Sequence, residues 1–536
     1  MIDTTVDIKN FYDTNYKPLT PYGQETAKKM LFIADKETLE KEYQLIEQTI
    51  KFIERYPIVA DKIEFYLKKI PFLYSLDILD FDSSDLFLIK KFLVNYFDIT
   101  QELKRIPAHI FDISFSSKKL LEALCVDQEE ADSFYLNDKY SEKLESVRKK
   151  IKKIDKELEA IKQEQLSKIL EKFKLDFKLR DFLVINENAA VMLDKKYFFI
   201  EPFDSKNFIV KPIYSEKYFA LYLERDRLVI EEQKQENVIL GKLSKQVLSE
   251  KNKIIEYIKA VTKLDILISK SRLAIKYGMT KPVIKPAGNS VKLKNGRYIP
   301  LVDKCNVLGT KYYPLTSKFS NNIIVVTGSN MGGKTILLQT ICFMQTFAQM
   351  GFFVPADLYE TVIFDNIYYI GETRKEDVNG LSSFGLEIYE FMKAYGHLKG
   401  KTLFIIDEFA KATNSREAIA LLSAILKTFS ENSDIYMFLS THFLELPKLK
   451  NTSFYKMKGL DYSGYEKYYT KERDYSLDER IRFINRYMRY EVIPDDSIVK
   501  QYDALNVANI LGFDKKILSY AKEYMACMRE KKDDSK

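Results

Sequence analysis

The sequence predicts a multidomain α/β protein in which a helical core, a long coiled-coil arm with a small β-rich cap, and a parallel α/β sheet follow one another. Three observations support this fold class. Apolar residues recur at helical spacing from about 24 to 125, a heptad seam begins near 140 in a highly charged segment, and strands alternate with helices from about 285. The chain has 536 residues, enough for several domains with large cores.

The same patterns divide the chain into six segments. The boundaries are 1–135 for the helical core domain, 136–180 for the first long helix of the arm, 181–230 for the β-rich cap, 231–284 for the second long helix, 285–480 for the domain with the parallel sheet, and 481–536 for a C-terminal helical element with a polar tail.

The helical core is predicted from apolar residues three and four positions apart, such as Leu39, Tyr43, Ile46, Ile50 and Ile53. This spacing places an apolar stripe on one side of a helix. We therefore expect an all-α domain in this part of the chain.

The arm is predicted from two apolar seams separated by short strands. The first seam consists of Leu144, Val147, Ile151, Ile154, Leu158 and Ile161, and the second of Leu240, Leu243, Val247, Ile254, Ile258 and Val261. Such spacing is typical of coiled coils. Residues 184–185, 197–200, 208–210 and 219–223 have the composition of strands. We expect an antiparallel coiled-coil arm that carries a small β cap.

A phosphate-binding loop is predicted at the start of the sheet domain. It fits the pattern G-x-x-x-x-G-K-[ST] and consists of Gly328, Ser329, Asn330, Met331, Gly332, Gly333, Lys334 and Thr335. An apolar run at 323–326 precedes it and an apolar helical pattern follows, which is the strand–loop–helix context the motif needs. In such loops backbone N–H groups surround phosphate oxygens. We expect Lys334 to bridge the β- and γ-phosphates and Thr335 to bind Mg²⁺.

Two further strands end in polar residues that suit the same site. Residues 402–408 form an apolar run that ends in Asp407 and Glu408, and residues 435–442 form another that ends in Thr441 and His442. Parallel strands deliver such residues to one edge of a sheet. We expect Asp407 to act at Mg²⁺ and Glu408 to orient the attacking water. His442 either caps its strand or senses phosphate, and we favour the second role because the chain has only three histidines.

These motifs resemble the ATPase domain of the MutS family. The resemblance rests on TGSNMGGKT, GLSSFGLEIYE, IIDEFAKATNSREA and STHF, in this order and at this spacing. It extends more weakly to residues 19–23, 264–269 and 296–300, and to 507–513, which look like the family's C-terminal helix-turn-helix. It implies a P-loop NTPase that binds ATP with Mg²⁺, and two lever helices with a clamp-like cap.

The resemblance also implies a dimer with composite ATP sites. In the family, a serine that matches Ser382 reaches the γ-phosphate held by the partner subunit, so Ser382 is expected to act in trans. The C-terminal segment would then form the dimerisation element. Whether the dimer is homomeric or heteromeric is open, and one alternative is that this chain is a regulatory or inactive partner.

Departures from the mismatch-repair members leave the target open. The chain begins almost at the predicted helical core, so we expect no mismatch-reading domain. The residues after Glu408 include Ala410, Lys411 and Ala412, where mismatch-repair members have Gly-Arg-Gly. The motifs also resemble the MutS-like reactivase branch that serves cobalamin-dependent lysine and ornithine aminomutases. The target is therefore DNA without mismatch preference, or a protein such as an aminomutase.

The composition excludes a membrane-spanning protein and is typical of a soluble one. Hydrophobic residues make up 46% and charged residues 30% of the chain, and no stretch approaches about 20 apolar residues. The net charge of +7 is small for this length, so it permits nucleic-acid binding without indicating it. Four cysteines (Cys125, Cys305, Cys342 and Cys527) lack metal-ligand spacing, and we expect free thiols in the cytoplasm.

Overall fold

The computed structural model of the chain describes all residues except 1, 4, 75, 77–78, 107–110, 127–133, 178–179, 287, 289, 329–331, 372–381, 462–463, 465–474, 496–502 and 534–536. The chain is a mixed α/β protein with two compact units. The first consists of Met1–Asp61, Ala108–Phe111 and Thr262–Lys536, and the second of Lys62–Pro107 and Asp112–Val261. No helix in the described part of the chain is long and apolar enough to cross a membrane.

The first unit is built on a seven-stranded sheet. Its strands, in spatial order, are β1 (Ile2–Asp3), β10 (Asn366–Ile370), β11 (Thr402–Asp407), β12 (Ile435–Ser440), β8 (Ile323–Thr327), β13 (Thr452–Leu460) and β14 (Met488–Pro494). All neighbours are parallel except β13 and β14. The continuous apolar runs seen in the sequence are therefore strands buried on both faces, as parallel sheets require.

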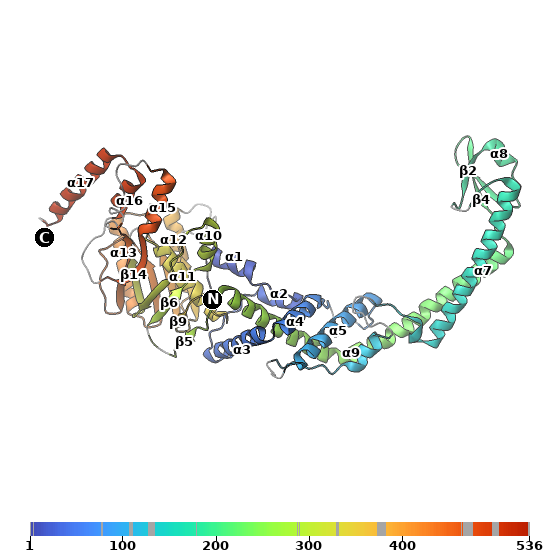
Figure 1. Ribbon diagram of the computed structural model, residues 1–536, viewed down its shortest axis with the longest axis horizontal. Helices are drawn as coiled ribbons and strands as arrows, with labels where there is room; N and C mark the ends of the chain where they lie inside the picture. The colour runs from blue at the N-terminus through green and yellow to red at the C-terminus, as the bar shows by residue number, and fades with distance from the viewer. Residues whose placement is uncertain are drawn as a thin grey trace. The chain divides into compact units, whose positions relative to one another are not determined.

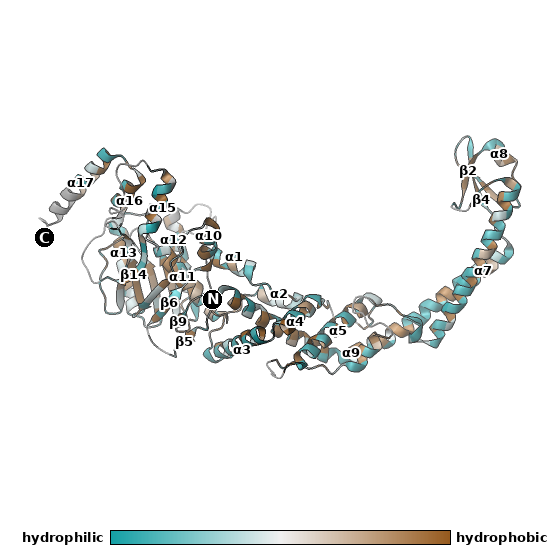
Figure 2. Ribbon diagram, in the orientation of Figure 1, coloured by the Kyte–Doolittle hydropathy of each residue, from teal (hydrophilic) through white to brown (hydrophobic). Residues whose placement is uncertain are grey.

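Helices cover both faces of this sheet. Ile324 and Val326 of β8 pack in one core with α11 (Lys334–Gln349). Ile323 and Val325 point to the other face and pack in a second core with α12 (Ser383–Gly396) and α13 (Ser415–Ser430). Figure 1 shows these helices around the strands of the unit, and Figure 2 shows the strands mostly brown. This packing fixes the edge of the sheet at which β8, β11 and β12 end.

Smaller elements complete the first unit. A four-stranded sheet has the order β5 (Val283–Ile284), β9 (Leu358–Thr361), β6 (Val291–Gly296) and β7 (Leu315–Phe319). The helices are α1 (Val6–Asn15), α2 (Pro21–Ala27), α3 (Lys36–Arg55), the start of α4 (Pro57–Lys69), the end of α9 (Glu216–Tyr277), α10 (Ile299–Leu308), α15 (Leu477–Tyr487), α16 (Asp503–Leu511) and α17 (Lys515–Asp533).

A buried carboxylate joins two of the segments that carried the resemblance. Asp265 of α9 is fully buried and accepts hydrogen bonds from the backbone N–H groups of Leu19 (2.8 Å) and Thr20 (2.7 Å) and from the Thr20 hydroxyl (2.7 Å). A side chain at Gly23 would collide with Asp265, because a Cβ there lies 2.3 Å from Oδ2. The start of α2 is therefore held to α9 by hydrogen bonds that replace the carboxylate's hydration.

The second unit contains the predicted arm and cap. Besides the rest of α4 and most of α9, its elements are α5 (Ser83–Lys104), α6 (Lys118–Leu124), the 3₁₀ helix η1 (Asp138–Tyr140), α7 (Glu142–Phe173), β2 (Leu183–Asn186), α8 (Glu187–Val191), β3 (Phe198–Pro202) and β4 (Asn207–Pro212). The cap is an antiparallel sheet of order β2-β4-β3 whose inner face packs Phe198 and Val210 against the end of α7.

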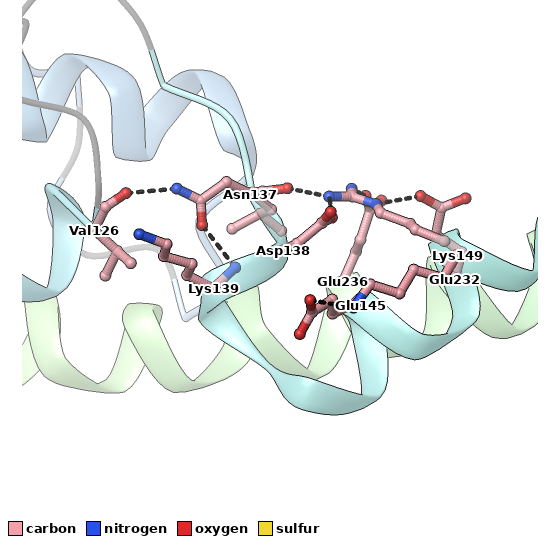
Figure 3. A network of polar contacts seen from close by, with 10 residues as sticks. Val126, Asn137, Asp138, Lys139, Glu145, Lys149, Glu232 and Glu236 are labelled. Atoms are coloured by element: carbon pink, nitrogen blue, oxygen red, sulfur yellow. Dashed lines mark hydrogen bonds and ion pairs between the residues drawn. The ribbon is translucent and has the colours of Figure 1, made fainter. Parts of the chain in front are cut away.

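Polar contacts show that α7 and the first half of α9 run antiparallel. The Arg148 guanidinium contacts Glu232 and Glu236 at 2.6 Å each and Asp138 at 3.1 Å. Further along α7, Asp155 instead pairs with an earlier residue of α9, Arg225. Figure 3 shows Asp138 and the two glutamates of α9 near the start of α7.

One prediction for the arm is wrong, and the second seam has further packing partners. Residues 219–223 are not a strand, because α9 begins at Glu216 and runs without a break through them. The second seam does not pack only against α7: from Ser244 onward α9 contacts the other helices of its unit. Ser244 accepts a hydrogen bond from the backbone of Phe81 (3.0 Å), and Tyr257 stacks on Tyr96 of α5 with ring centroids 4.5 Å apart. The cause is length, since α7 has 32 residues and α9 has 62.

Candidate nucleotide site

The predicted loop lies between β8 and α11. Gly328 and Gly333 both have positive φ, +134° and +91°. A side chain at Gly333 would also be tightly packed, because a Cβ there would lie 3.1 Å from the Tyr490 ring. It caps α11, and no side chain satisfies the first N–H groups of that helix. The N-terminus of this helix, with its partial positive charge, is the kind of place where proteins bind anions. Gly332 is buried, and Ser329, Asn330 and Met331 lie outside the described residues.

Lys334 is held at the centre of the site. Its ammonium group donates a hydrogen bond to the Gly328 carbonyl (2.8 Å) and lies 3.2 Å from the Glu408 carboxylate. Its side chain is only 2% exposed. A buried ammonium needs such partners. The carboxylate partner, Glu408, directly follows β11, whereas the Gly328 carbonyl directly follows β8.

Asp407 ends β11 and faces β12. The Ser440 hydroxyl donates to its Oδ1 at 2.5 Å, because the register of β11 and β12 places Ser440 opposite Asp407. Burial raises the pKa of Asp407 above its ordinary value, and hydrogen bonds from the Ser440 and Thr335 hydroxyls partly offset this. The structure thus brings together Asp407 and Thr335, the two residues predicted to act at Mg²⁺.

Glu408 follows directly and adopts a left-handed backbone conformation, with φ +51°. Its N–H donates to the backbone oxygen (3.2 Å) and hydroxyl (3.0 Å) of Ser440, which fixes the turn. Its carboxylate lies between Lys334 (3.2 Å) and Lys411 (3.3 Å). Burial alone would raise the pKa of Glu408, but these two ammonium groups outweigh burial and the net shift is downward.

His442 lies beside this pair. Its ring contacts Phe443 with centroids 4.0 Å apart. Burial lowers the pKa of His442 below its ordinary value, while Glu408 acts in the opposite direction and Lys334 adds to the lowering. The charges of Lys334 and Glu408 therefore both affect the pKa of the imidazole.

Ser382 is the N-cap of α12, on the side of the sheet away from α11. Its hydroxyl oxygen accepts a hydrogen bond from the Gly385 N–H (3.2 Å), and the residue is exposed. Within this chain Ser382 makes a capping contact, and its role in trans stays a prediction. Residues 372–381, which include Gly380 of the GLSSFGLEIYE motif, lie outside the described part of the chain.

Comparison with known sequences identifies the chain's family. Residues 324–529 match the family described as MutS domain V, a range that begins in β8 and includes Lys334, Asp407, Glu408 and His442. Through this region the chain belongs to the MutS family.

Relatives in the MutS family match only part of their own length. The chain is 28% identical to DNA mismatch repair protein MSH3 of Candida glabrata over 204 residues, 37% of this chain and 20% of the relative. It is 29% identical to DNA mismatch repair protein MutS of Pseudothermotoga lettingae over 219 residues (40% and 26%). It is 28% identical to Endonuclease MutS2 of Finegoldia magna over 326 residues (60% and 38%). The chain thus spans less than two fifths of each of these relatives.

In this MutS-family chain a cavity of about 630 Å³ opens beside the phosphate loop, and sequence reasoning missed most of its wall. Lys334 and Thr335 line one end. The rest of the lining includes Lys311, Tyr312, Tyr313, Cys305, Met457, Arg482, Arg486 and Tyr490. The Tyr313 and Tyr490 rings lie 5.6 Å apart. A pair of tyrosines at 312–313 is visible in the sequence, but nothing local predicts that it meets residues 482–490.

Proposed function

We propose that this chain binds ATP with Mg²⁺ and hydrolyses it, and that it does so in a dimer whose conformation follows the nucleotide. The observation that carries this proposal is the convergence of Lys334, Asp407 with Thr335, and Glu408 at one edge of the sheet. Two separate segments supply these groups, the start of α11 and the end of β11. Together they provide a cation for phosphate, oxygen ligands for a metal and a carboxylate for water.

Phosphate binding follows from the loop and Lys334. The N-terminus of α11 and the Lys334 ammonium provide positive charge for phosphate oxygens. Mg²⁺ in phosphate sites takes one or two protein oxygens and completes its shell with phosphate and water. The Asp407 carboxylate and Thr335 hydroxyl fit that donor set, since both are hard oxygen ligands and the Thr335 hydroxyl lies close enough to lower the pKa of Asp407. When bound, the ion would neutralise charge on the phosphates.

Hydrolysis needs a group that orients water, and Glu408 suits this role. Its lowered pKa keeps it ionised at neutral pH, so it can accept a hydrogen bond and then a proton from water. His442, whose pKa is lowered, stays neutral and can donate one N–H to a terminal phosphate oxygen. The base would lie towards Tyr313 and Tyr490, whose rings offer apolar faces.

A hydrolysis assay tests this proposal. Wild-type protein is expected to release phosphate from ATP only with Mg²⁺, and Lys334→Ala and Asp407→Asn are each expected to reduce the rate about a hundredfold. Lys399→Ala, an exposed lysine on the loop before β11, serves as the control. Unchanged hydrolysis in Lys334→Ala protein that keeps its circular dichroism spectrum would refute the assignment.

Ser382 supports a composite site in the proposed dimer. Because its oxygen accepts a bond from Gly385, its hydroxyl hydrogen remains available to donate to a phosphate of the partner subunit. We further propose that the dimer works in the cytoplasm. The described cysteines, Cys125, Cys305 and Cys342, are free thiols, as a reducing compartment requires.

A protein target is favoured over DNA by the cap. Strand alternation places Val184, Phe199 and Ile209 on the outer face of the β2-β4-β3 sheet, with Lys211 and Glu201 paired at 2.5 Å among them, and the exposed Phe203 follows the end of β3. Val184, Phe199 and Phe203 are 44%, 55% and 59% exposed. Residues 174–224 contain eight Lys and Arg and eight Asp and Glu. A neutral, apolar face does not attract a polyanion, whereas it fits an apolar, uncharged patch of a protein.

Binding measurements distinguish the two targets. We expect no preference for a G·T mismatch over matched duplex, and little binding of either at 150 mM salt. A tenfold mismatch preference at two salt concentrations would restore a repair role, and steeply salt-dependent binding would favour DNA. The protein partner implied by the reactivase resemblance is a cobalamin-dependent aminomutase. If purified aminomutase binds wild-type protein and the Tyr74→Glu control but not Phe199→Glu, the cap is the docking face; equal binding by all three would exclude the cap.

A further inference from the structure

Helix α15 brings two arginines to the wall of the nucleotide cavity. Arg482 and Arg486 are four residues apart, so they lie on one face of the helix. Both line the cavity whose other end is formed by Lys334 and Thr335. The cavity therefore has positive groups on two sides, one at the phosphate loop and one on an element near the end of the chain.

No ion pair or hydrogen bond joins either guanidinium to another described residue, although that of Arg486 lies over the Tyr487 ring, 5.8 Å from its centroid. Arg480 donates to the Tyr475 carbonyl (2.8 Å), and Arg489 pairs with Asp461 (3.2 Å). Like charges four residues apart on a helix destabilise it. Two unneutralised guanidinium groups in a cavity wall are therefore suited to an anion that both can contact.

The chemistry of the cavity identifies that anion as a phosphate of the bound nucleotide. This step rests on the proposed function. Guanidinium groups bind phosphate oxygens through paired N–H donors. The loop N–H groups and Lys334 serve the terminal phosphates, which leaves the oxygens of the phosphate next to the ribose for groups further along the cavity. We propose that Arg482 and Arg486 bind this α-phosphate and thereby couple nucleotide binding to the C-terminal helices.

The coupling follows from the two sides of α15. Arg482 and Arg486 line the cavity, whereas Ile484 is buried in a core with Val507 and Ile510 of α16. A phosphate that holds the two arginines thus also holds the surface on which α16 packs. Nucleotide binding would thus affect the C-terminal helices through α15 rather than through the sheet.

Affinity measurements on the full-length chain test the contact. Displacement of a fluorescent ATP analogue gives affinities for ATP, ADP, GTP and adenosine, for wild-type protein and for Arg482→Gln/Arg486→Gln. We expect the double variant to lose about tenfold in affinity for ATP and ADP and nothing for adenosine. The control is Arg416→Gln/Lys427→Gln, which removes two exposed charges from α13 on the other side of the sheet.

Hydrogen exchange tests the coupling. ATP is expected to slow exchange in residues 477–511 of wild-type and control protein and to leave it unchanged in the double variant. Equal ATP affinity in double variant and control, an equal loss for adenosine, or a loss for GTP alone would overturn the inference. If one of these three results is found while wild-type protein binds ATP and Lys334→Ala does not, only the role of the two arginines is refuted. If wild-type protein binds no nucleotide, the proposed function fails as well.

Discussion

Replacing Glu408 with glutamine removes a carboxylate that competes with ATP for Lys334. The ion pair is 3.2 Å long, and the two side chains are 16% and 2% exposed. Two unit charges at this distance attract by about 5 kcal/mol at an effective dielectric constant of 20. A γ-phosphate on the same ammonium replaces most of that attraction. We expect the uncompensated part to be about 1 kcal/mol, as for partly exposed pairs.

The Glu408→Gln variant should therefore bind ATP up to about tenfold more tightly than wild-type protein. It should also hydrolyse ATP about a hundredfold more slowly, because the group that orients and deprotonates water is lost. Isothermal titration calorimetry with Mg²⁺ gives the affinity, and phosphate release gives the rate.

Lys411→Gln is the matched control for this variant. Lys411 contacts the other oxygen of Glu408 at 3.3 Å, so its loss leaves Glu408 more strongly attracted to Lys334. We expect ATP affinity in this control to stay the same or fall slightly. Weaker ATP binding by Glu408→Gln than by wild-type protein, or hydrolysis at the normal rate, would refute the reasoning.

Three other perturbations test separate parts of the account. Burial lowers the pKa of His442, so its neutral form stabilises the fold at high pH. This contribution is lost as pH falls from the ordinary value of 6.5 through the folded pKa. NMR titration of the three histidines should show a pKa of His442 below 6.5, and a value above 6.5 would contradict the assignment. Asp265→Asn replaces one carboxylate oxygen by an NH2 group, so either the Leu19 N–H or the Thr20 N–H loses its acceptor and faces a donor. Chemical denaturation should then show a loss of about 1.5–3 kcal/mol, and a loss below about 0.5 kcal/mol would be inconsistent with those hydrogen bonds. Mixing Ser382→Ala with Lys334→Ala protein should restore hydrolysis at one site per mixed dimer if Ser382 acts in trans, whereas no recovery after proven subunit exchange would argue against it.

The meeting of Lys334, Asp407 and Glu408 could be predicted from the sequence because it depends on local patterns. Apolar runs at 323–326 and 402–406 are strands buried on both faces. Both pair in parallel with β12, so the residues that follow each run lie at the same edge of the sheet. Lys334, Asp407 and Glu408 needed no other information. That Ser440 would lie opposite Asp407 depends on register, which the sequence does not reveal.

The end of the cavity that we propose for the base depends on topology and could not be predicted from the sequence. Tyr313 and Tyr490 meet because β13 returns beside β8 and β14 folds back antiparallel on β13, a strand order that no local pattern encodes. The prediction of a strand in the arm was wrong for a different reason. Residues 219–223 are aromatic and apolar, as strands often are, but a helix that starts at Glu216 extends through them because each further residue adds a hydrogen bond.

Direct measurement of ATP binding to wild-type and Lys334→Ala protein tests the central claim, that this site binds nucleotide phosphates. Calorimetry with Mg²⁺ should show one ATP per wild-type chain. The lysine variant should bind about a hundredfold more weakly, because a charge-assisted contact in a buried site is lost. Lys399→Ala, which removes an exposed ammonium, should match wild-type protein. Equal ATP affinity in all three proteins would contradict the account.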